Sequence, residues 1–448
     1  MPEFIKTYIG HLYLARRFYL VAGLCIVLFV AAFLLPELFP YARLVFFVFL
    51  ALVLVDYVFL FLVSKAPVAK RMVSERLSNG DENRIGIQVK NSMPFTVRME
   101  IIDELPVQFQ IRDWVMNYRL KAGEQKNIFY TLRPVERGQY HFGRLILYVR
   151  SLLGLLKRRY NMEAAQTVQV YPSYLQMRRY SLLSQTTIQT EYGNRRMRKL
   201  GHSMEFEQIK EYVRGDDIRS VNWKATARKA SLMVNSYTDE RSQQVYCVID
   251  KGRLMKMPFG GLTLLDYAIN STLVLSNVCL QKQDRVGVIS FANKMGSVLA
   301  ADRKAIQLQN ILQLLYNQET AFQESDYEML YMQIRSRIKH RSLIVLYTNF
   351  ETISGLYRQL NYLRSIARHH LLMVVFFENT ELHQLSRLEA KNVEDVYVKT
   401  IAEKFEFEKR QIVKELRKHG ILSVLTAPEN LTINAVNKYL ELKARQAI

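Results

Sequence analysis

Two long apolar segments stand near the start of the chain, and a finer alternation of apolar and polar positions follows them. FYLVAGLCIVLFVAAFLL (18–35) contains no charged residue, and LVFFVFLALVLVDYVFLFLV (44–63) contains only Asp56. As a helix, each segment is long enough to cross a hydrocarbon core about 30 Å thick. The pattern therefore predicts a transmembrane helical hairpin within residues 1–65, with spans near 18–35 and 44–63 joined by the short link PELFPYAR.

The charges around this hairpin predict its orientation. Three cations precede the first span and three follow the second, whereas the link carries one residue of each sign, Glu37 and Arg43. The flanking cations are Lys6, Arg16, Arg17, Lys65, Lys70 and Arg71. Because Lys and Arg concentrate in cytoplasmic segments, we expect an inner (cytoplasmic) membrane protein with both termini and all soluble domains in the cytoplasm. A cleaved signal peptide fits poorly, since no small-residue cleavage site precedes the second apolar run.

Asp56 lies inside the second apolar segment, where a carboxylate is costly unless it has a partner. Two interpretations stay open. The side chain could bond to another subunit or to a membrane partner, or it could instead tilt toward an interface or bond to a nearby hydroxyl.

Residues 66–175 change to short alternating stretches separated by turns. RIGIQVKNSMPFTVRMEIIDELP breaks at Asn91, and YRLKAGEQKNIFYTLRP repeats the plan around Gly123. Several strands at this spacing predict an antiparallel β-sandwich-like domain. This region contains no His/Cys cluster and no glycine-rich phosphate loop, so we expect a spacer or interaction domain with Trp114 in its core.

Residues 243–448 show the longer rhythm of an α/β domain. Four apolar strands, QQVYCVID, DRVGVISFA, SLIVLYTNF and LLMVVFFEN, alternate with helical segments, and GSVLAAD is expected to add an edge strand. Such alternation predicts a doubly wound parallel sheet covered by helices on both faces. Ligands of these sheets bind beyond the carboxyl ends of the strands.

Basic residues dominate the connector at 176–242, in a chain whose net charge is +21. Arg195, Arg196, Arg198 and Lys199 lie in a polar, glycine-containing stretch that predicts a loop. Contact with anionic inner-membrane lipid and a simple solvated face both remain open. Nucleic acid is not the expected ligand, because neither interleaved aromatic residues nor a reading helix accompanies the cluster.

One part of the connector, FEQIKEYVRGDDIRSVNWKATARKASLMVNSYTDER (206–241), carries a dense pattern of charges around a tryptophan. The signature residues are Glu205, Glu211, Arg214, Gly215, Asp216, Asp217, Arg219, Trp223, Lys224, Arg228 and Glu240. In order, spacing and residue type they resemble the signature of the bacterial "domain of unknown function 58" family. The resemblance extends over essentially the whole chain.

This resemblance implies both a layout and a partner. Members of the family have two N-terminal membrane spans, a β-sandwich region and a von Willebrand factor type A-like domain. They are commonly associated with MoxR-type AAA+ ATPases, which implies an adaptor or substrate-recruiting role at the membrane.

The chemistry of the signature favours a structural brace or docking surface. Its cations can pair with its carboxylates, and Trp223 offers a flat face for a guanidinium. A neighbouring cation lowers the pKa of a carboxylate and makes it a poor proton shuttle at neutral pH. A general acid and base among these carboxylates is the less favoured alternative.

The carboxyl edge of the predicted sheet carries a degenerate metal site. The von Willebrand type A family has Asp-x-Ser-x-Ser after the first strand, a threonine in a later loop and an aspartate after the fourth strand. Here Asp250 remains, but Gly252 and Leu254 replace the hydroxyls, Thr320 is a weak loop candidate, and Asn349 stands for the later aspartate. A divalent cation needs several hard oxygen ligands, so we expect no metal. Arg253 or Lys251 is expected to occupy the metal position and pair with Asp250.

Few other residues suggest an enzyme. Cys25, Cys247 and Cys279 are scattered through apolar stretches without disulfide or metal spacing, which favours a reducing compartment. We therefore expect a membrane-anchored, non-enzymatic adaptor without cofactors that works with a MoxR-type AAA+ ATPase and contacts inner-membrane lipid. The alternatives are an enzyme using the signature carboxylates and a membrane-proximal binder of anionic lipid or nucleic acid.

Overall fold

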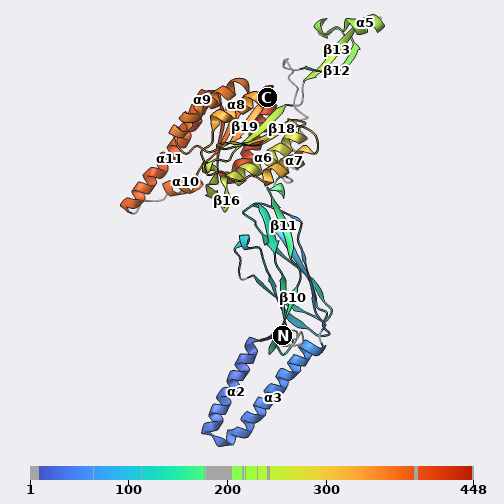
Figure 1. Cartoon of the computed structure of the whole chain (residues 1–448), viewed down its shortest axis with the longest axis vertical. Helices are drawn as coiled ribbons and strands as arrows, with labels where there is room; N and C mark the ends of the chain where they lie inside the picture. Colours follow the sequence, from blue (N-terminus) through green and yellow to red (C-terminus); the bar gives the residue numbers. More distant parts are fainter. Residues whose placement is uncertain are drawn as a thin grey trace. The chain divides into compact units, whose positions relative to one another are not determined.

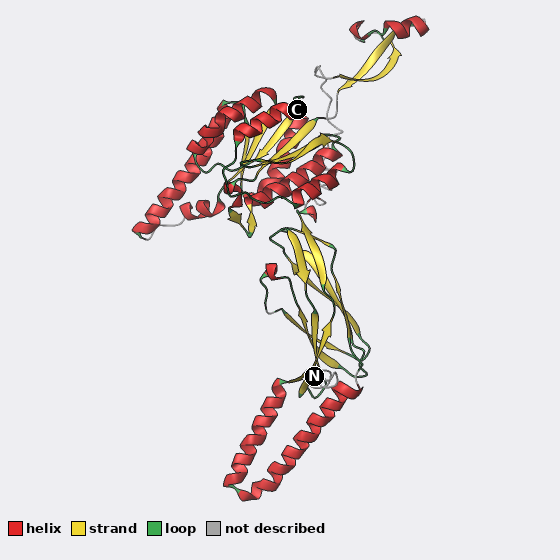
Figure 2. Ribbon diagram, viewed as in Figure 1, coloured by secondary structure: helices red, strands yellow, loops and turns green. Residues whose placement is uncertain are grey.

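The computed structural model of the chain forms two compact units, Met1–Tyr171 and Pro172–Ile448. The residues it describes are 10–63, 65–112, 114–175, 177, 204–213, 216, 218–229, 231–239, 243–387 and 392–445. Figure 1 labels the helices and strands along the chain, and Figure 2 colours them by type.

An apolar helical hairpin lies near the start of the first unit (Figure 1). α2 (Arg16–Leu34) and α3 (Phe39–Val58) are joined by the 3-10 turn η1 (Pro36–Leu38), and the π-helical turn η2 (Phe59–Val63) extends α3. Two segments, Arg16–Leu34 and Pro36–Val63, are long and apolar enough to cross a membrane. The second helix starts earlier than predicted because Pro40 lies in its first turn, where the missing N–H of proline is not needed.

The rest of the described first unit is a β-rich domain with three sheets around one apolar core, and its first strand precedes the helical hairpin in the chain. The strand orders are β1-β10-β9-β5-β6, β2-β4-β7 and β3-β11-β8. The strands are β1 (Leu12–Leu14), β2 (Val68–Met72), β3 (Arg76–Ser78), β4 (Asn83–Lys90), β5 (Val97–Asp103), β6 (Val115–Leu120), β7 (Gln125–Leu132), β8 (Gly138–Phe142), β9 (Leu145–Arg150), β10 (Leu156–Met162) and β11 (Gln166–Tyr171), with the turn η3 (Val107–Phe109) after β5. Val97, Met99 and Ile101 of β5 are buried, and the residues between them face outward, as the period of two requires.

Two residues discussed in the sequence analysis, Trp114 and Arg71, have defined contacts in this domain. Trp114 is half-buried and packs against Tyr130, with ring centroids 5.2 Å apart. Arg71, counted above among the cations flanking the hairpin, is instead buried and forms an ion pair with Asp103. Its charge is therefore satisfied inside the domain.

The loop between β9 and β10 joins the β-rich domain to the hairpin. Asp56 of α3 is fully buried, and its carboxylate accepts hydrogen bonds from the hydroxyl of Ser151 and the N–H groups of Leu155 (2.9 Å) and Leu156 (2.8 Å). Of the two interpretations of Asp56, the structure shows bonding to a nearby hydroxyl, supplemented by two backbone donors. The end of α3 is thus enclosed by the β-rich domain.

A mixed six-stranded sheet lies at the centre of the described part of the second unit, in the order β18-β17-β14-β19-β20-β21. The strands are β14 (Gln244–Asp250), β17 (Arg285–Phe291), β18 (Met295–Asp302), β19 (Leu343–Tyr347), β20 (Leu371–Phe377) and β21 (Leu422–Thr426). All neighbours pair in parallel except β17 and β18, which are antiparallel. The sheet is therefore mixed rather than wholly parallel, because β18, the predicted edge strand, returns directly from β17.

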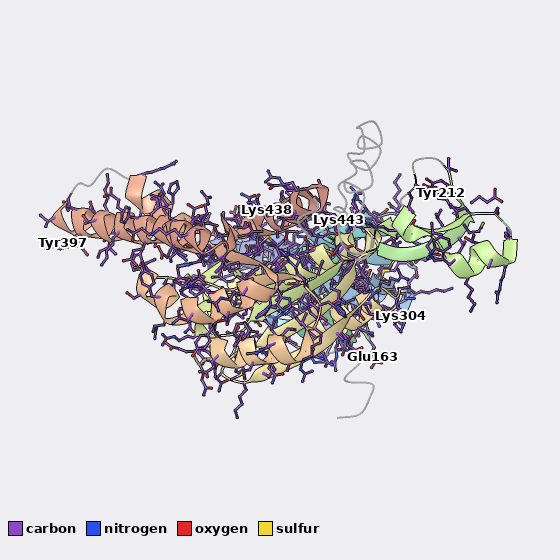
Figure 3. The ribbon with its side chains drawn as sticks, turned by 90° about the horizontal axis from the view of Figure 1, so that it is seen from above. Glu163, Tyr212, Lys304, Tyr397, Lys438 and Lys443 are labelled. Carbon is purple, nitrogen blue, oxygen red and sulfur yellow. The ribbon has the colours of Figure 1, made fainter. Side chains whose placement is uncertain are left out.

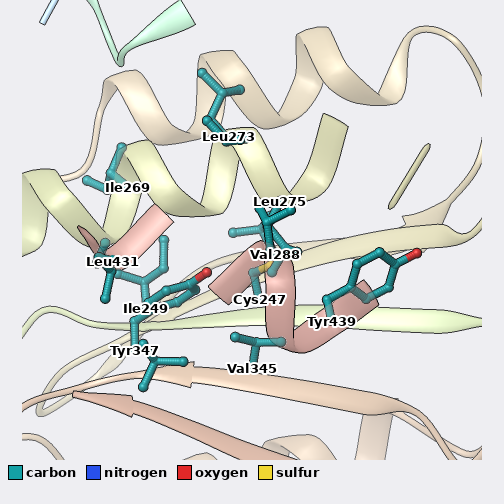
Figure 4. Packing of buried hydrophobic residues seen from close by; sticks show 14 of the residues in the cluster. Cys247, Ile249, Ile269, Leu273, Leu275, Val288, Val345, Tyr347, Leu431 and Tyr439 are labelled. Carbon is teal, nitrogen blue, oxygen red and sulfur yellow. The ribbon is translucent and has the colours of Figure 1, made fainter. Parts of the chain in front are cut away.

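Helices cover both faces of this sheet (Figure 2). One face packs against α6 (Leu264–Gln281), α7 (Gln307–Tyr316) and α12 (Leu431–Ala444), and the other against α8 (Tyr327–Arg337), α9 (Ile353–His369) and α11 (Val393–Lys418). Figure 4 shows the first of these cores, where Cys247, Ile249 and Val345 lie beneath α6. Smaller elements are η5 (Arg253–Lys256), β15 (Pro258–Phe259), β16 (Leu262–Thr263), α10 (Thr380–Arg387) and η6 (Pro428–Asn430).

The signature residues that the structure describes belong to an antiparallel hairpin of the second unit. β12 (Met204–Glu211) pairs with β13 (Met233–Asp239), and η4 (Ile218–Ser220) and α5 (Trp223–Lys229) lie between them. We call residues 204–239 the signature hairpin.

Candidate functional site

Asp250 ends β14 at the carboxyl edge of the sheet, and hydrogen-bond donors enclose its carboxylate. The N–H of Gly252 (2.8 Å) and the hydroxyls of Ser325, Thr348 (2.7 Å) and Tyr327 (3.3 Å) all donate to it. The residue is only 5% exposed. Burial raises the pKa of Asp250, and the donated hydrogen bonds oppose that shift. This edge of the sheet is built around a buried acid with protein partners.

Gly252 is required by this arrangement. A Cβ atom at residue 252 would overlap Ser325 Oγ, so the small residue makes room for a hydroxyl that arrives from a distant loop. The expectation that Lys251 or Arg253 pairs with Asp250 is wrong for the described contacts, because hydroxyls fill that space and Arg253 is exposed. Lys251 is half-buried, and burial lowers its pKa.

Thr320 and Asn349, the other residues of the predicted metal edge, do not join Asp250 through any contact in the described residues. Thr320 lies in the loop after α7, where the next residue donates its N–H to the Lys251 carbonyl (2.7 Å). The loop hydroxyl that reaches Asp250 is Ser325. Asn349 is buried and accepts a hydrogen bond from Lys409 Nζ (2.7 Å).

A cavity of about 300 Å³ opens beside Asn349, next to the carboxyl ends of β20 and β21. Apolar side chains and a set of charged groups line it, and both α10 and α11 contribute. The lining residues are Met257, Phe259, Leu264, Asn349, Glu351, Phe377, Glu378, Asn379, Leu382, His383, Phe405, Glu406, Lys409, Arg410 and Leu425. An apolar cavity with a few convergent polar groups at this edge is a typical place for a ligand in such sheets.

Lys409 is the most unusual group in the cavity. It is only 9% exposed, and its Nζ donates to Asn349. Burial lowers the pKa of Lys409 to about 7, and the fields of Glu351 and Glu378 only partly oppose this. The ammonium group is therefore close to its titration point at neutral pH.

Glu378, His383 and Glu406 could hold a metal ion by geometry, since their ligand atoms lie within 4.8 Å of one another. Glu406 Oε1 already accepts from Arg410 (2.6 Å) and lies 3.4 Å from His383 Nδ1. A cation would have to displace Arg410 from that oxygen. The donor set therefore fits an ion pair at least as well as a metal.

Among the signature carboxylates, Asp216 is bound to neighbouring donors. Asp216 forms an ion pair with Lys210 (2.9 Å) and accepts the N–H of Val213 (3.1 Å). The hydrogen bond from Lys210 is the main cause of a lowered pKa at Asp216. Glu211 ends β12 in an exposed position, and Glu205 lies within the same strand.

Several apolar and cationic residues of the signature hairpin, whose ribbon and side chains are drawn in Figure 3, are exposed. Trp223 is 72% exposed, Ile218 70% and Val213 63%. Arg219, Lys224 and Arg228 are exposed as well. Trp223 therefore lies on the surface of the signature hairpin in the part of the chain that the structure describes.

Part of the predicted signature lies outside the described residues, namely Arg214, Gly215, Asp217 and Glu240, together with the basic cluster Arg195, Arg196, Arg198 and Lys199.

Sequence reasoning missed the hydroxyls of Ser325, Tyr327 and Thr348 and the buried Lys409. Thr348 directly follows the strand LIVLY, a position that a sheet-edge argument could have used. Lys409 shares the face of the buried residues Ala402, Ile412 and Leu416, which lie seven or three residues away.

Comparison with known proteins supports the resemblance to the signature family. The family model "Protein of unknown function DUF58" matches residues 208–419. "Uncharacterized protein YeaD" of Bacillus subtilis (strain 168) is 25% identical over 189 residues, which cover 41% of this chain and 47% of the relative. The chain thus spans about half the length of that relative.

Solved structures show only distant likeness. The conserved hypothetical protein BatB from Bacteroides thetaiotaomicron has a TM-score of 0.32 at 12% identity, covering 46% of this chain and 100% of that one. The CARDB domain of the PF1109 protein from Pyrococcus furiosus, solved in complex with di-metal ions, has a TM-score of 0.19 at 13% identity over 25% of this chain and 96% of that one. These scores are too low to assign a fold or a ligand.

Proposed function

We propose that this protein is a membrane-anchored adaptor whose soluble domains lie in the cytoplasm and bind another protein through the signature hairpin. The family resemblance suggests a MoxR-type AAA+ ATPase as that partner. In this proposal the hairpin of α2 and α3 anchors the chain, the β-rich domain is a sandwich-like spacer, and the second unit is a von Willebrand type A-like domain with a degenerate metal edge.

The exposure of Val213, Ile218 and Trp223 carries the proposal. Large apolar side chains clustered in a short segment of a soluble domain are typical of a surface that another protein covers. Tryptophan is also among the residues that contribute most to protein interfaces. The surrounding cations Arg219, Lys224 and Arg228 favour a partner with an acidic rim.

The described carboxylates support a non-enzymatic role. Asp216 is held in its charged form by Lys210, so it would donate protons poorly near neutral pH. Asp250 is enclosed by four donors from the chain itself, which leaves little room for a substrate atom to reach it.

The direct test is a cross-linked pull-down of the full chain from membranes. The wild type should recover an AAA+ ATPase, and Trp223→Ala should lose it. Tyr357→Ala is the matched control, because Tyr357 is a 53% exposed aromatic on α9, away from the signature hairpin in sequence. Equal recovery from all three proteins would exclude the signature hairpin as the docking surface.

A further inference from the structure

The outer face of the five-stranded sheet carries a row of four cations in direct register. Lys157 of β10 lies opposite Arg150 of β9, Arg150 lies opposite Arg98 of β5, and Arg98 lies opposite Arg119 of β6. Cross-strand partners share one face of a sheet. We call Lys157, Arg150, Arg98 and Arg119 the basic row.

Such a row is unfavourable by itself. Like charges directly opposite each other destabilise a sheet. Glu100 relieves part of this repulsion, because it pairs with Lys157 (2.8 Å) and Arg150. Arg98 and Arg119 are exposed and have no ion pair among the described contacts. One carboxylate therefore faces four cations, which leaves a concentrated positive surface.

The basic row lies at the end of the sheet that meets the apolar hairpin. Arg150 ends β9 and Leu156 begins β10, and the loop between them holds Asp56 of α3. Arg17 of α2 donates to the carbonyl of Leu153 in the same loop (3.0 Å). The charge of Arg17 is also close enough to Arg150 to contribute to lowering its pKa, behind burial and Arg98.

Apolar and aromatic side chains border this positive surface. Leu152, in the loop that holds Asp56, is 72% exposed, and Tyr19 in the first turn of α2 is 61% exposed. Tyrosines are enriched where a protein passes from lipid to water. Beyond Tyr19 the helices expose mainly apolar side chains such as Val30, at 60%. Cations, aromatic residue and apolar surface thus follow one another in the order found at a membrane boundary.

We propose that the basic row and Arg17 bind the headgroups of anionic phospholipids, with Leu152 inserted in the lipid beside them. The inference rests on the proposed membrane anchoring by α2 and α3. It assigns the lipid contact to the β-rich domain, where the like charges lose their mutual repulsion when phosphate groups lie between them. Nucleic acid or free phosphate would meet the same cations, but neither explains the exposed Leu152 next to them.

The test compares full-length proteins reconstituted in phosphatidylcholine vesicles in which about one lipid in three is the anionic phosphatidylglycerol. After detergent extraction, the phosphatidylglycerol retained per chain is counted by native mass spectrometry. Arg98→Gln/Arg119→Gln should retain about tenfold less than the wild type, since each removed charge weakens attraction to an anionic surface. Lys304→Gln/Arg358→Gln, which removes two exposed charges from the second unit, should behave as the wild type.

Three results would overturn the proposal. In the first, the wild type and Arg98→Gln/Arg119→Gln retain equal amounts of phosphatidylglycerol. In the second, Lys304→Gln/Arg358→Gln loses as much lipid as Arg98→Gln/Arg119→Gln does. In the third, inorganic phosphate displaces the bound phosphatidylglycerol as effectively as added phosphatidylglycerol would. A measurement of membrane depth by fluorescence quenching distinguishes failure of this lipid-binding proposal from failure of the proposed membrane anchoring by α2 and α3. A fluorophore on Val30→Cys should be quenched by brominated lipid if the hairpin spans the membrane, and one on Leu152→Cys should be quenched only if the loop also inserts. Quenching at Val30 without quenching at Leu152 would reject the lipid-inserted loop while leaving the anchor intact.

Discussion

Asp56 Oδ2 accepts a 2.9 Å hydrogen bond from the N–H of Leu155, and this contact joins the second apolar helix to the β-rich domain. Leu156 donates to the same oxygen at 2.8 Å, and Ser151 donates to the other. The Asp56 carboxylate, which is costly inside an apolar segment without a partner, thus accepts hydrogen bonds from the loop between β9 and β10. The helix end and the domain behave as one structural piece.

Replacing Asp56 should therefore destabilise the first unit. In Asp56→Val two buried N–H groups lose their acceptor, and each unsatisfied group costs about 1–3 kcal/mol. We expect a lower unfolding midpoint for the detergent-purified full chain, followed by circular dichroism in urea. Glu37→Val is the control, because Glu37 is exposed in the turn between the helices. An Asp56→Val protein as stable as this control would contradict the role of the acceptor.

Gly252 and Ser325 should be energetically coupled. Gly252→Ala places a methyl group on Ser325 Oγ, and we expect a loss of about 1–3 kcal/mol, as for overpacking in a core. Ser325→Ala removes the obstructing oxygen, so the double variant should recover part of the loss. A double-mutant cycle from denaturant unfolding measures this coupling. Strictly additive effects would show that the two residues do not meet as described.

Lys409 should give stability a distinct dependence on pH. Its pKa is lowered to about 7 in the folded chain from an ordinary value of 10.5. Between these values the unfolded chain binds more protons, so the contribution of Lys409 to stability rises as the pH increases from 7 toward 10.5. Below pH 7 the full cost of a buried charge remains.

The comparison with Lys409→Met isolates this effect. The variant should be more stable than the wild type below pH 7, and the difference should shrink as the pH rises toward 10. Lys418→Met is the control, because Lys418 is exposed and pairs with Glu415 on the same helix. A wild-type-minus-variant difference that does not change with pH would refute the lowered pKa.

Magnesium and manganese should not bind at Asp250. Its oxygens are engaged by Gly252, Ser325, Tyr327 and Thr348, and a metal would have to displace several of these donors. Calorimetric titration of the full chain with each ion should show no micromolar site. Micromolar binding that disappears in Asp250→Ala would contradict this prediction.

The sequence predicted element types better than it predicted which side chains meet. Long apolar runs and strand–helix alternation indicated the two helices and the α/β layers, because these depend on local periodicity. The hydroxyl set around Asp250 could not be predicted, since Ser325 and Thr348 reach it from loops 75 and 98 residues away. Register produced the basic row in the same way, because Arg98 and Arg150 become neighbours only when β5 pairs with β9.

Two cations lie where residue type alone would not place them. Lys409 and Arg71 are both buried with specific partners, Asn349 and Asp103. Residue type gives a strong expectation of exposure for Lys and Arg. Only the tertiary fold shows where a buried hydrogen-bond acceptor allows a Lys or Arg side chain to be buried instead of exposed.

The central claim, an adaptor that docks through the signature hairpin, is tested most directly by quantifying an AAA+ ATPase cross-linked to the full chain in membranes. Isotope-labelled mass spectrometry should find the ATPase enriched on the wild type and on Tyr357→Ala, and reduced to the background of untagged membranes on Trp223→Ala. The account would be contradicted if the wild type recovered no more ATPase than untagged membranes do, or if Trp223→Ala recovered as much ATPase as the wild type.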